Sequence, residues 1–206
     1  EYVCSLSSLK EHQEKTMNTE LQQRLNQIHE KITSEEFLTG KRLGGDLSFW
    51  IFDYSPQHEL QVREYIEFLK QTMSQKQANI KLAHVDLLEL VSNYLKDRNF
   101  LEKSFQMEKR KGSEGLLSAL KGPIHTDKLT PYLVENIKAN DQDVVLVSGI
   151  GSVWPVLRAH NLLNSLHARL NKPFVLFYPG GYDGQTLSLF NRVKNNHYYR
   201  AFRLVP

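Results

Sequence analysis

Three polar residues stand at the ends of short apolar runs, where chemistry is often found in α/β proteins. Asp53 and Asp86 each close such a run, and Ser148 closes a third. Two carboxylates at neighbouring strand ends could hold Mg²⁺ or act as an acid–base pair. Aspartates in these positions more often cap a turn or the following helix. The sequence leaves both interpretations open, with capping the commoner one.

A glycine loop, Ser148-Gly149-Ile150-Gly151-Ser152, follows the third of these runs. A strand, a glycine loop and a helix in this order can present bare backbone amides to a phosphate. The loop lacks the third glycine of a dinucleotide-binding fingerprint, and no acid follows about 20 residues on. We therefore favour an ordinary tight turn with a helix cap. Gly40-Lys41 is not a P-loop, because it precedes a strand and no Ser or Thr follows the lysine.

No other arrangement of residues carries a catalytic signature. The eight histidines are scattered, and His160 and His167 lie two turns apart on one helix face, too far for a shared metal. The sequence has no His-x-x-x-His pair and no nucleophile elbow, and its single cysteine is Cys4. We therefore predict that the protein is not an enzyme and has no catalytic, cofactor-binding or metal-binding residues.

Five runs rich in apolar residues must form the strands that position these side chains. They cover residues 47–54, 80–85, 143–147, 173–178 and 198–205. Amphipathic helices are expected around them, among them residues 18–32, 55–77, 153–170 and a short helix at 186–190. Such alternation indicates a parallel sheet covered on both faces. We predict an α/β fold with a mostly parallel five-stranded sheet and helices on both faces, Rossmann-like or NTPase-like without a P-loop.

The length of 206 residues suits one domain with its own core. Hydrophobic residues make up 40% of the chain and charged residues 24%, which is typical of a globular protein. We predict a single α/β domain over residues 17–206, and we interpret residues 1–16, which are polar and precede Met17, as a leader or an added extension. No apolar run reaches 18 residues and no signal peptide opens the chain, so we expect a cytoplasmic protein without a membrane partner.

Charge is distributed unevenly along the chain. Residues 151–206 hold seven Arg or Lys and one acid, Asp183, whereas the remainder holds 19 basic and 22 acidic residues. A basic C-terminal third could meet nucleic acid, an acidic protein face or a phosphate-bearing ligand. It could equally fold against the acidic remainder, with Arg200 and Arg203 in salt bridges.

Several uncommon motifs, most of them in the C-terminal third, point to a family. They are Leu157-Arg158-Ala159-His160-Asn161-Leu162-Leu163, Phe177-Tyr178-Pro179-Gly180-Gly181-Tyr182-Asp183-Gly184-Gln185 and Tyr198-Tyr199-Arg200-Ala201-Phe202-Arg203-Leu204, preceded by Leu43-Gly44-Gly45 and Phe49-Trp50-Ile51-Phe52-Asp53-Tyr54. In these motifs and their order, from about Met17 to the C-terminus, the chain resembles the BrxB family, small components of the bacteriophage-exclusion (BREX) defence systems of bacteria.

The resemblance implies a role and not a reaction. BREX operons encode the ATPase BrxC, the adenine methyltransferase PglX and the phosphatase-like PglZ, and BrxB proteins have no assigned activity. The resemblance therefore implies a non-catalytic adaptor or assembly factor, with PglZ and BrxC as candidate protein partners. Two alternatives stay open. One is a DNA-binding adaptor that uses the basic third, with weak or indirect DNA association. The other is a nucleotide- or phosphate-binding protein at the strand-edge cleft of Asp53, Asp86 and residues 148–151.

Four residues of the C-terminal third are our candidates for partner contact: Arg158, His160, Tyr182 and Arg200. Arg and Tyr are enriched at interface hot spots, and tyrosine offers amphipathic contact area. The loop of residues 180–185 is rich in glycine, and we expect it to be exposed and available for recognition.

Overall fold

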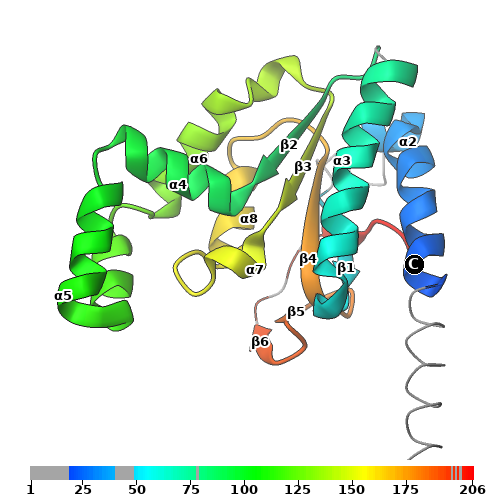
Figure 1. Cartoon of the computed structure of the whole chain (residues 1–206). Helices are drawn as coiled ribbons and strands as arrows, with labels where there is room; N and C mark the ends of the chain where they lie inside the picture. The colour runs from blue at the N-terminus through cyan, green and yellow to red at the C-terminus, as the bar shows by residue number, and fades with distance from the viewer. Residues whose placement is uncertain (1–18, 40–48, 78, 196, 198, 200) are drawn as a thin grey trace, which may run out of the picture.

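The computed structural model describes residues 19–39, 49–77, 79–195, 197, 199 and 201–206, and its centre is a parallel sheet (Figure 1). Five parallel strands lie side by side in the order β2-β3-β4-β1-β7. Their bounds are β1 Phe49–Tyr54, β2 Leu82–Asp86, β3 Val144–Ser148, β4 Phe174–Tyr182 and β7 Ala201–Arg203. The predicted α/β fold with a mostly parallel sheet is confirmed, and each predicted strand corresponds to one of these five.

Two further short strands, β5 (Leu187–Leu189) and β6 (Val193–Asn195), extend the sheet to seven strands. β5 pairs antiparallel with the end of β4, and β6 pairs with β5. The predicted helix at residues 186–190 is therefore wrong. Leu187 and Leu189 are buried while the residue between them is half-buried, which is the alternation of a strand. The positive φ angles of Phe190 and Asn191 close the hairpin.

One face of the sheet is covered by helices from the first part of the chain. They are the N-terminal helix (residues 19–33), α2 (Glu35–Thr39) and α3 (Glu59–Lys76), which a 3₁₀ turn at Pro56–His58 precedes. Their apolar side chains meet β1, β3 and β4 in a first core, whose members include Ile28, Ile66, Phe52, Leu146 and Phe177. Each of these five side chains is at most 1% exposed, so this face is closed to water.

The opposite face is covered by α4 (Leu87–Asp97), α6 (Thr126–Asn136), α7 (Ile150–Val153) and α8 (Ala159–His167), with a 3₁₀ turn at Ala139–Asp141. These helices pack on the other side of the strands, against Ile51, Val145 and Leu176, in a second core. Helices therefore lie on both faces, as predicted. The single helix predicted at residues 153–170 is wrong. Trp154 is extended, with φ −69° and ψ 141°, because a residue before proline avoids the helical region, and α8 begins only at Ala159.

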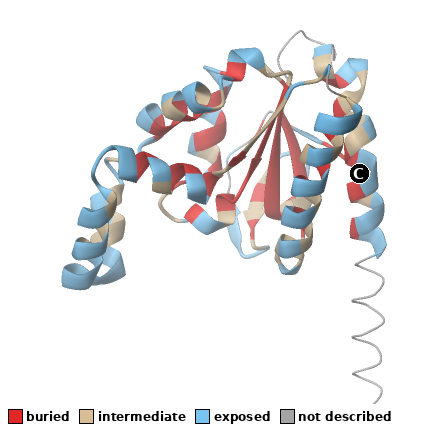
Figure 2. Cartoon of the chain, turned by 45° about the horizontal axis from the view of Figure 1, so that its top comes forward, coloured by how far each residue is buried: buried red, intermediate tan, exposed pale blue. Residues whose placement is uncertain are grey.

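One helix stands out from this layered body. α5 (Leu101–Leu120) follows α4, bends at Gly112 and has no buried residue. Figures 1 and 2 show it projecting away from the sheet on the side of α4, with exposed and half-buried residues but no buried ones. Gly112 has φ 68° and ψ −174°, a backbone conformation open essentially to glycine only. We call residues 101–120 the α5 arm.

Some predictions fall outside the described residues. The leader at residues 1–16 lies there, so the domain boundary at residue 17 stays a prediction. The same holds for the turns at residues 40–41 and 43–45 and for the predicted contact residue Arg200. Within the described ranges, no helix combines the length and the apolar character needed to cross a bilayer.

Candidate functional site

The two strand-terminal aspartates do not meet. Asp53 lies on β1 and Asp86 ends β2, and both β3 and β4 lie between these strands. The condition for a shared Mg²⁺ ion or an acid–base pair is therefore not fulfilled. Among the described residues, no group of three His, Cys, Asp or Glu side chains gathers as a metal site would require.

Asp86 caps α4, which is the commoner of the two roles that the sequence allowed. Its Oδ1 accepts hydrogen bonds from the backbone N–H groups of Leu88 (2.9 Å) and Glu89 (3.1 Å). The same carboxylate fills the space beside Gly149, where a Cβ atom would lie 3.0 Å from Oδ2. The glycine loop after β3 is thus packed against a carboxylate and leads into a helix of four residues. It is a tight turn, as we favoured, and a carboxylate beside it opposes phosphate binding.

Asp53 joins three parts of the chain. Its carboxylate accepts hydrogen bonds from Arg24 of the N-terminal helix (3.0 Å), from the backbone N–H of Tyr182 (3.1 Å) and from Arg203 of β7 (3.4 Å). Arg203 also donates to the carbonyl oxygen of Tyr182. The Asp53 side chain is only 13% exposed. Part of the basic third therefore folds against an acid of the remainder, which was one of the two interpretations.

Tyr182, a predicted contact residue, lies inside the protein. It is 2% exposed, and its hydroxyl lies within hydrogen-bond distance of the carbonyl oxygens of Gly184 (2.9 Å) and Ala201 (2.7 Å). Only the last part of the loop of residues 180–185 is exposed, since its first residues belong to β4. There Asp183 accepts hydrogen bonds from the Thr186 hydroxyl and from nearby backbone N–H groups, which lower the pKa of Asp183 to about 2. Tyr182 therefore anchors this loop from within.

Ser148 and His84 come nearest to a catalytic arrangement in the described part of the chain. Ser148 Oγ lies 2.9 Å from His84 Nε2, and His84 Nδ1 lies 3.9 Å from Glu67 Oε1. Burial lowers the pKa of His84, so its ring is neutral at pH 7. A nucleophile must be reachable by its substrate, yet Ser148 is only 3% exposed. We interpret the pair as a partly buried hydrogen bond between β2 and β3.

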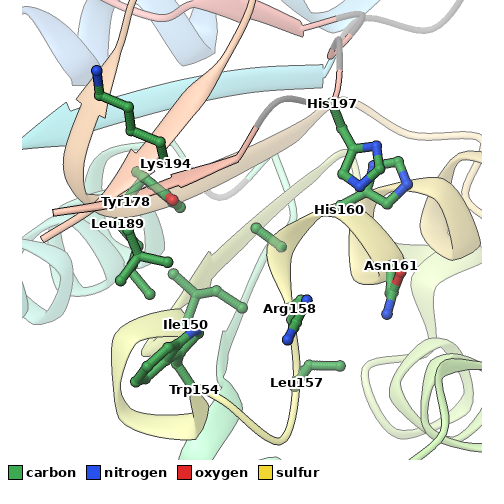
Figure 3. A pocket seen from close by; sticks show the side chains of 12 residues that line it. Ile150, Trp154, Leu157, Arg158, His160, Asn161, Tyr178, Leu189, Lys194 and His197 are labelled. Atoms are coloured by element: carbon green, nitrogen blue, oxygen red, sulfur yellow. The ribbon is translucent and has the colours of Figure 1, made fainter. Parts of the chain in front are cut away.

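A cavity opens at the carboxyl edge of β3 and β4, and Figure 3 shows it from close by. Its volume is about 220 Å³. Two of the predicted contact residues, Arg158 and His160, line it together with Trp154, Asn161 and His197. The structure thus brings Arg158 and His160 to one place, at the strand edge where an α/β sheet holds its ligands.

His160 and His197 form one wall of this cavity. Their rings stack with centroids 3.8 Å apart and planes 12° apart. Burial, and then the neighbouring His197, lower the pKa of His160, so the His160 ring is neutral at pH 7. Asn164 Nδ2 lies 3.1 Å from His160 Nε2 and donates to it, which leaves the ring proton on Nδ1. This buried Nδ1–H has no hydrogen-bond partner among the described residues.

Arg158 supplies the positive charge of the cavity. It precedes α8 and is exposed, and its guanidinium forms no ion pair or hydrogen bond with any residue that the structure describes. No Asp or Glu lines the cavity. Lys194 also lines it, although its ammonium points away from Arg158 in Figure 3. The cavity is therefore rich in hydrogen-bond donors and has no carboxylate to neutralise them.

Sequence reasoning missed two residues of this cavity, Trp154 and His197. Trp154 is 41% exposed, which is unusual for tryptophan. The signal was present, because Trp154 precedes Pro155 and so could not continue a helix. His197 reaches His160 from a distant part of the chain, and no sequence pattern links the two.

Comparison with known proteins places these observations in a family. Residues 83–204 match the model of the family described as BREX protein BrxB. A BREX protein BrxB of Bacillus cereus (strain H3081.97) is 36% identical over 190 residues, which cover 90% of this chain and 97% of that protein. A BREX protein BrxB of Escherichia coli O9:H4 (strain HS) is 35% identical over 187 residues, which cover 90% of this chain and 92% of that protein. No solved structure matches the chain.

Proposed function

The chain belongs to the BrxB family of BREX proteins, and we propose that within this phage defence it acts as a non-catalytic adaptor or assembly factor that docks on PglZ, on BrxC or on both. Family membership confirms the resemblance to BrxB. The adaptor role and the absence of catalysis are our inference from the surface and the site, and the two partners are what the family resemblance implies.

The α5 arm is the observation that carries this proposal. None of its 20 residues is buried, and only Leu101 and Leu120, at its two ends, pack partly buried against the second core. Phe105 on the arm is 50% exposed, and Phe100 at its base is 37% exposed. Large apolar side chains that a protein keeps in water without need for its own packing mark surfaces for other proteins. A projecting helix with exposed aromatic residues is a surface that a partner groove can enclose.

The candidate site adds support for a role without catalysis. In the serine–histidine pair described above the serine is buried. The two strand-terminal aspartates are held in structural contacts on strands that are not neighbours. Arg158 and His160 stay our candidates for a second contact surface, at the cavity. Tyr182 is enclosed, and we assign it the anchoring of its loop instead.

Binding of the purified chain to purified PglZ and BrxC, with nuclease present, tests the proposal. Phe105→Ala removes an exposed ring from the arm and should weaken the complex at least tenfold, as expected for an aromatic hot spot. The matched control is Phe68→Ala on α3, which removes a ring that is 61% exposed on the other side of the sheet. It should change the Kd less than twofold.

Three outcomes would contradict the proposal. No complex with either protein at micromolar concentration would remove the adaptor role itself. Equal effects of Phe105→Ala and Phe68→Ala on the Kd would show that the arm is not the docking surface. A complex that disappears with nuclease would favour the DNA-binding alternative, and its affinity for duplex DNA should then fall steeply as salt rises.

A further inference from the structure

The cavity at the carboxyl edge of β3 and β4 has the features of a binding site for a small anion. We propose that it binds the phosphate group of a small ligand of the mononucleotide class, with Arg158 on the phosphate and Trp154 on the ring. The proposal concerns the chain alone and does not depend on any protein partner, so it stands or falls separately from the adaptor role.

Charge and hydrogen bonding select the phosphate. The Arg158 guanidinium has no partner among the described residues, and no carboxylate lines the cavity to neutralise it. Arg presents two parallel N–H groups that match two phosphate oxygens. The buried Nδ1–H of His160, in a residue that also lines the cavity, likewise lacks an acceptor among the described residues, and a buried donor without a partner costs free energy.

The remaining lining supplies further donors. Burial raises the pKa of Tyr178 well above its ordinary value, so this hydroxyl stays protonated and can donate. The first turn of α8, which includes Asn161, also lines the cavity, and its backbone N–H groups have no acceptor within the helix. The Arg158 guanidinium and the backbone N–H groups of the α8 first turn can only donate, and an oxyanion accepts from both. The set therefore suits an oxyanion.

Trp154 selects a ligand that carries an aromatic ring. Its indole is 41% exposed at the side of the cavity opposite the His160–His197 stack, and Arg158 lies between these two walls in Figure 3. Nucleobases stack on such exposed aromatic rings. A phosphate on Arg158 thus leaves an attached base within reach of the indole.

The size of the cavity limits the ligand. Its volume of about 220 Å³ is below the range of about 300–1,000 Å³ that is usual for sites of drug-sized ligands. One phosphate fits, with one ring resting against the exposed indole.

Tryptophan fluorescence of the full chain tests this site without any label. The chain has two tryptophans, and Trp50 is 2% exposed in the first core, so a ligand-dependent change reports on Trp154. AMP should quench the emission to saturation. Inorganic phosphate should compete with AMP at higher concentration, because it lacks the ring. Adenosine, which lacks the phosphate, should bind at least tenfold more weakly than AMP.

Two variants with the same loss of charge separate a site from a general attraction. Arg158→Gln should weaken AMP binding at least tenfold by calorimetry. Arg192→Gln removes a nearby exposed positive charge outside the cavity lining and should leave the affinity unchanged. Unchanged thermal unfolding of both variants would show that each is folded.

Three results would overturn the proposal. Equal binding of adenosine and AMP would show that the phosphate group is not recognised. Equal affinities of the wild type and Arg158→Gln for AMP would show that Arg158 does not bind the phosphate. Displacement of AMP by glutamate at the same concentration as by inorganic phosphate would make the cavity a receptor for carboxylates, such as an acidic side chain of a partner.

Discussion

The parallel sheet and the α5 arm differ most in where they keep their apolar side chains. Every residue of β3 is buried, and β4 has a single half-buried residue among nine. The arm has none buried along 20 residues. Phe177 in β4 is 0% exposed and Phe105 in the arm is 50% exposed. The stability of the chain therefore resides in the sheet, and the arm is free to serve another purpose.

The amino-acid sequences of the two regions explain this difference in burial. β3 reads Val-Val-Leu-Val-Ser, a continuous apolar run that only a strand covered on both faces can bury. The arm carries the charged run Glu108-Lys109-Arg110-Lys111 and further charges at Glu102, Lys103 and Glu114, whereas its last six residues are uncharged. A helix that is polar on most sides is not held by core packing. The same substitution should consequently lower the free energy of unfolding much more in the sheet than in the arm.

The largest effect is expected from removing a ring in each region. Phe177→Ala should lower the free energy of unfolding by about 3–5 kcal/mol, because it leaves a cavity in a closed core. Phe105→Ala should change it by less than about 0.5 kcal/mol, because the ring is already in water. Urea unfolding followed by circular dichroism measures both. A loss above about 2 kcal/mol for Phe105→Ala would mean that the arm is part of the cooperative fold.

Adding one methyl group compares the backbones of the two regions. Gly180→Ala would place a Cβ inside contact distance of the Ser188 carbonyl oxygen, across the β4–β5 pair. Because that neighbour is backbone, we expect a loss of about 3 kcal/mol, at the upper end for overpacking. At Gly112 the added atom meets nothing within 4 Å. Gly112→Ala strains only the bend of the arm, at about 1–3 kcal/mol locally.

Hydrogen exchange separates these two glycine variants. For Gly112→Ala we expect faster exchange confined to residues 101–120 and an unchanged urea midpoint. For Gly180→Ala we expect a lowered midpoint and faster exchange in the strands. A lowered midpoint in both variants would show that the bend of the arm and the sheet unfold together, against the comparison drawn above.

The sequence predicted the parallel strands of the sheet better than the short β5–β6 hairpin that extends it. The central strands β1, β3 and β4 were found because each is a continuous apolar run, and the outer strands β2 and β7 were found although their burial is weaker. The β5–β6 hairpin was missed because three residues, Leu187–Leu189, are too few to separate a strand period from a helical one. The break between α7 and α8 was missed because Pro155 is also a good residue for the first turn of a helix.

The candidate site was predicted in part, for a related reason. Arg158 and His160 are close in sequence, so a local motif could find both, and their roles as contacts stay a prediction. Tyr182 is enclosed because its hydroxyl meets the carbonyl of Ala201, a residue of β7 that only the folded sheet brings near. His197 joins the cavity in the same way. Contacts between distant segments carry no local signal.

Removing one carboxylate from each region should have a smaller effect on the free energy of unfolding. Asp53→Ala removes the acceptor shared by Arg24, Arg203 and the Tyr182 backbone, and should cost about 1.5–3 kcal/mol, as is typical of hydrogen bonds to charged groups. Glu108→Ala on the arm, where the residue is exposed, should stay within about 0.5 kcal/mol. Urea unfolding at low and at high salt checks both. A loss for Asp53→Ala that vanishes at high salt would mean that the network is screened as a surface ion pair is.

The smallest effect we expect is a loss of stability at low pH that is caused by a histidine of the sheet, His84 on β2. Burial, and then the charge of Lys70, lower the pKa of His84, while Glu67 and Asp86 act in the opposite direction. Between the ordinary histidine pKa of about 6.5 and the lower value of the folded state, the unfolded chain binds more protons. Stability contributed by the neutral ring is therefore complete above pH 6.5 and decreases as the pH falls below it. The urea midpoint should be lower at pH 5.5 than at pH 7.5.

His84→Gln tests whether this residue is the cause. Glutamine does not titrate, and its amide can still reach Ser148 Oγ, which lies 2.9 Å from the His84 ring in the wild type. The variant should lose part of the pH dependence while its stability at pH 7.5 changes little. His160→Gln provides the comparison, because the pKa of His160 is also lowered but its ring lies at the cavity. If His160→Gln removes more of the pH dependence than His84→Gln, the titrating group that limits stability lies at the edge of the sheet and not within it.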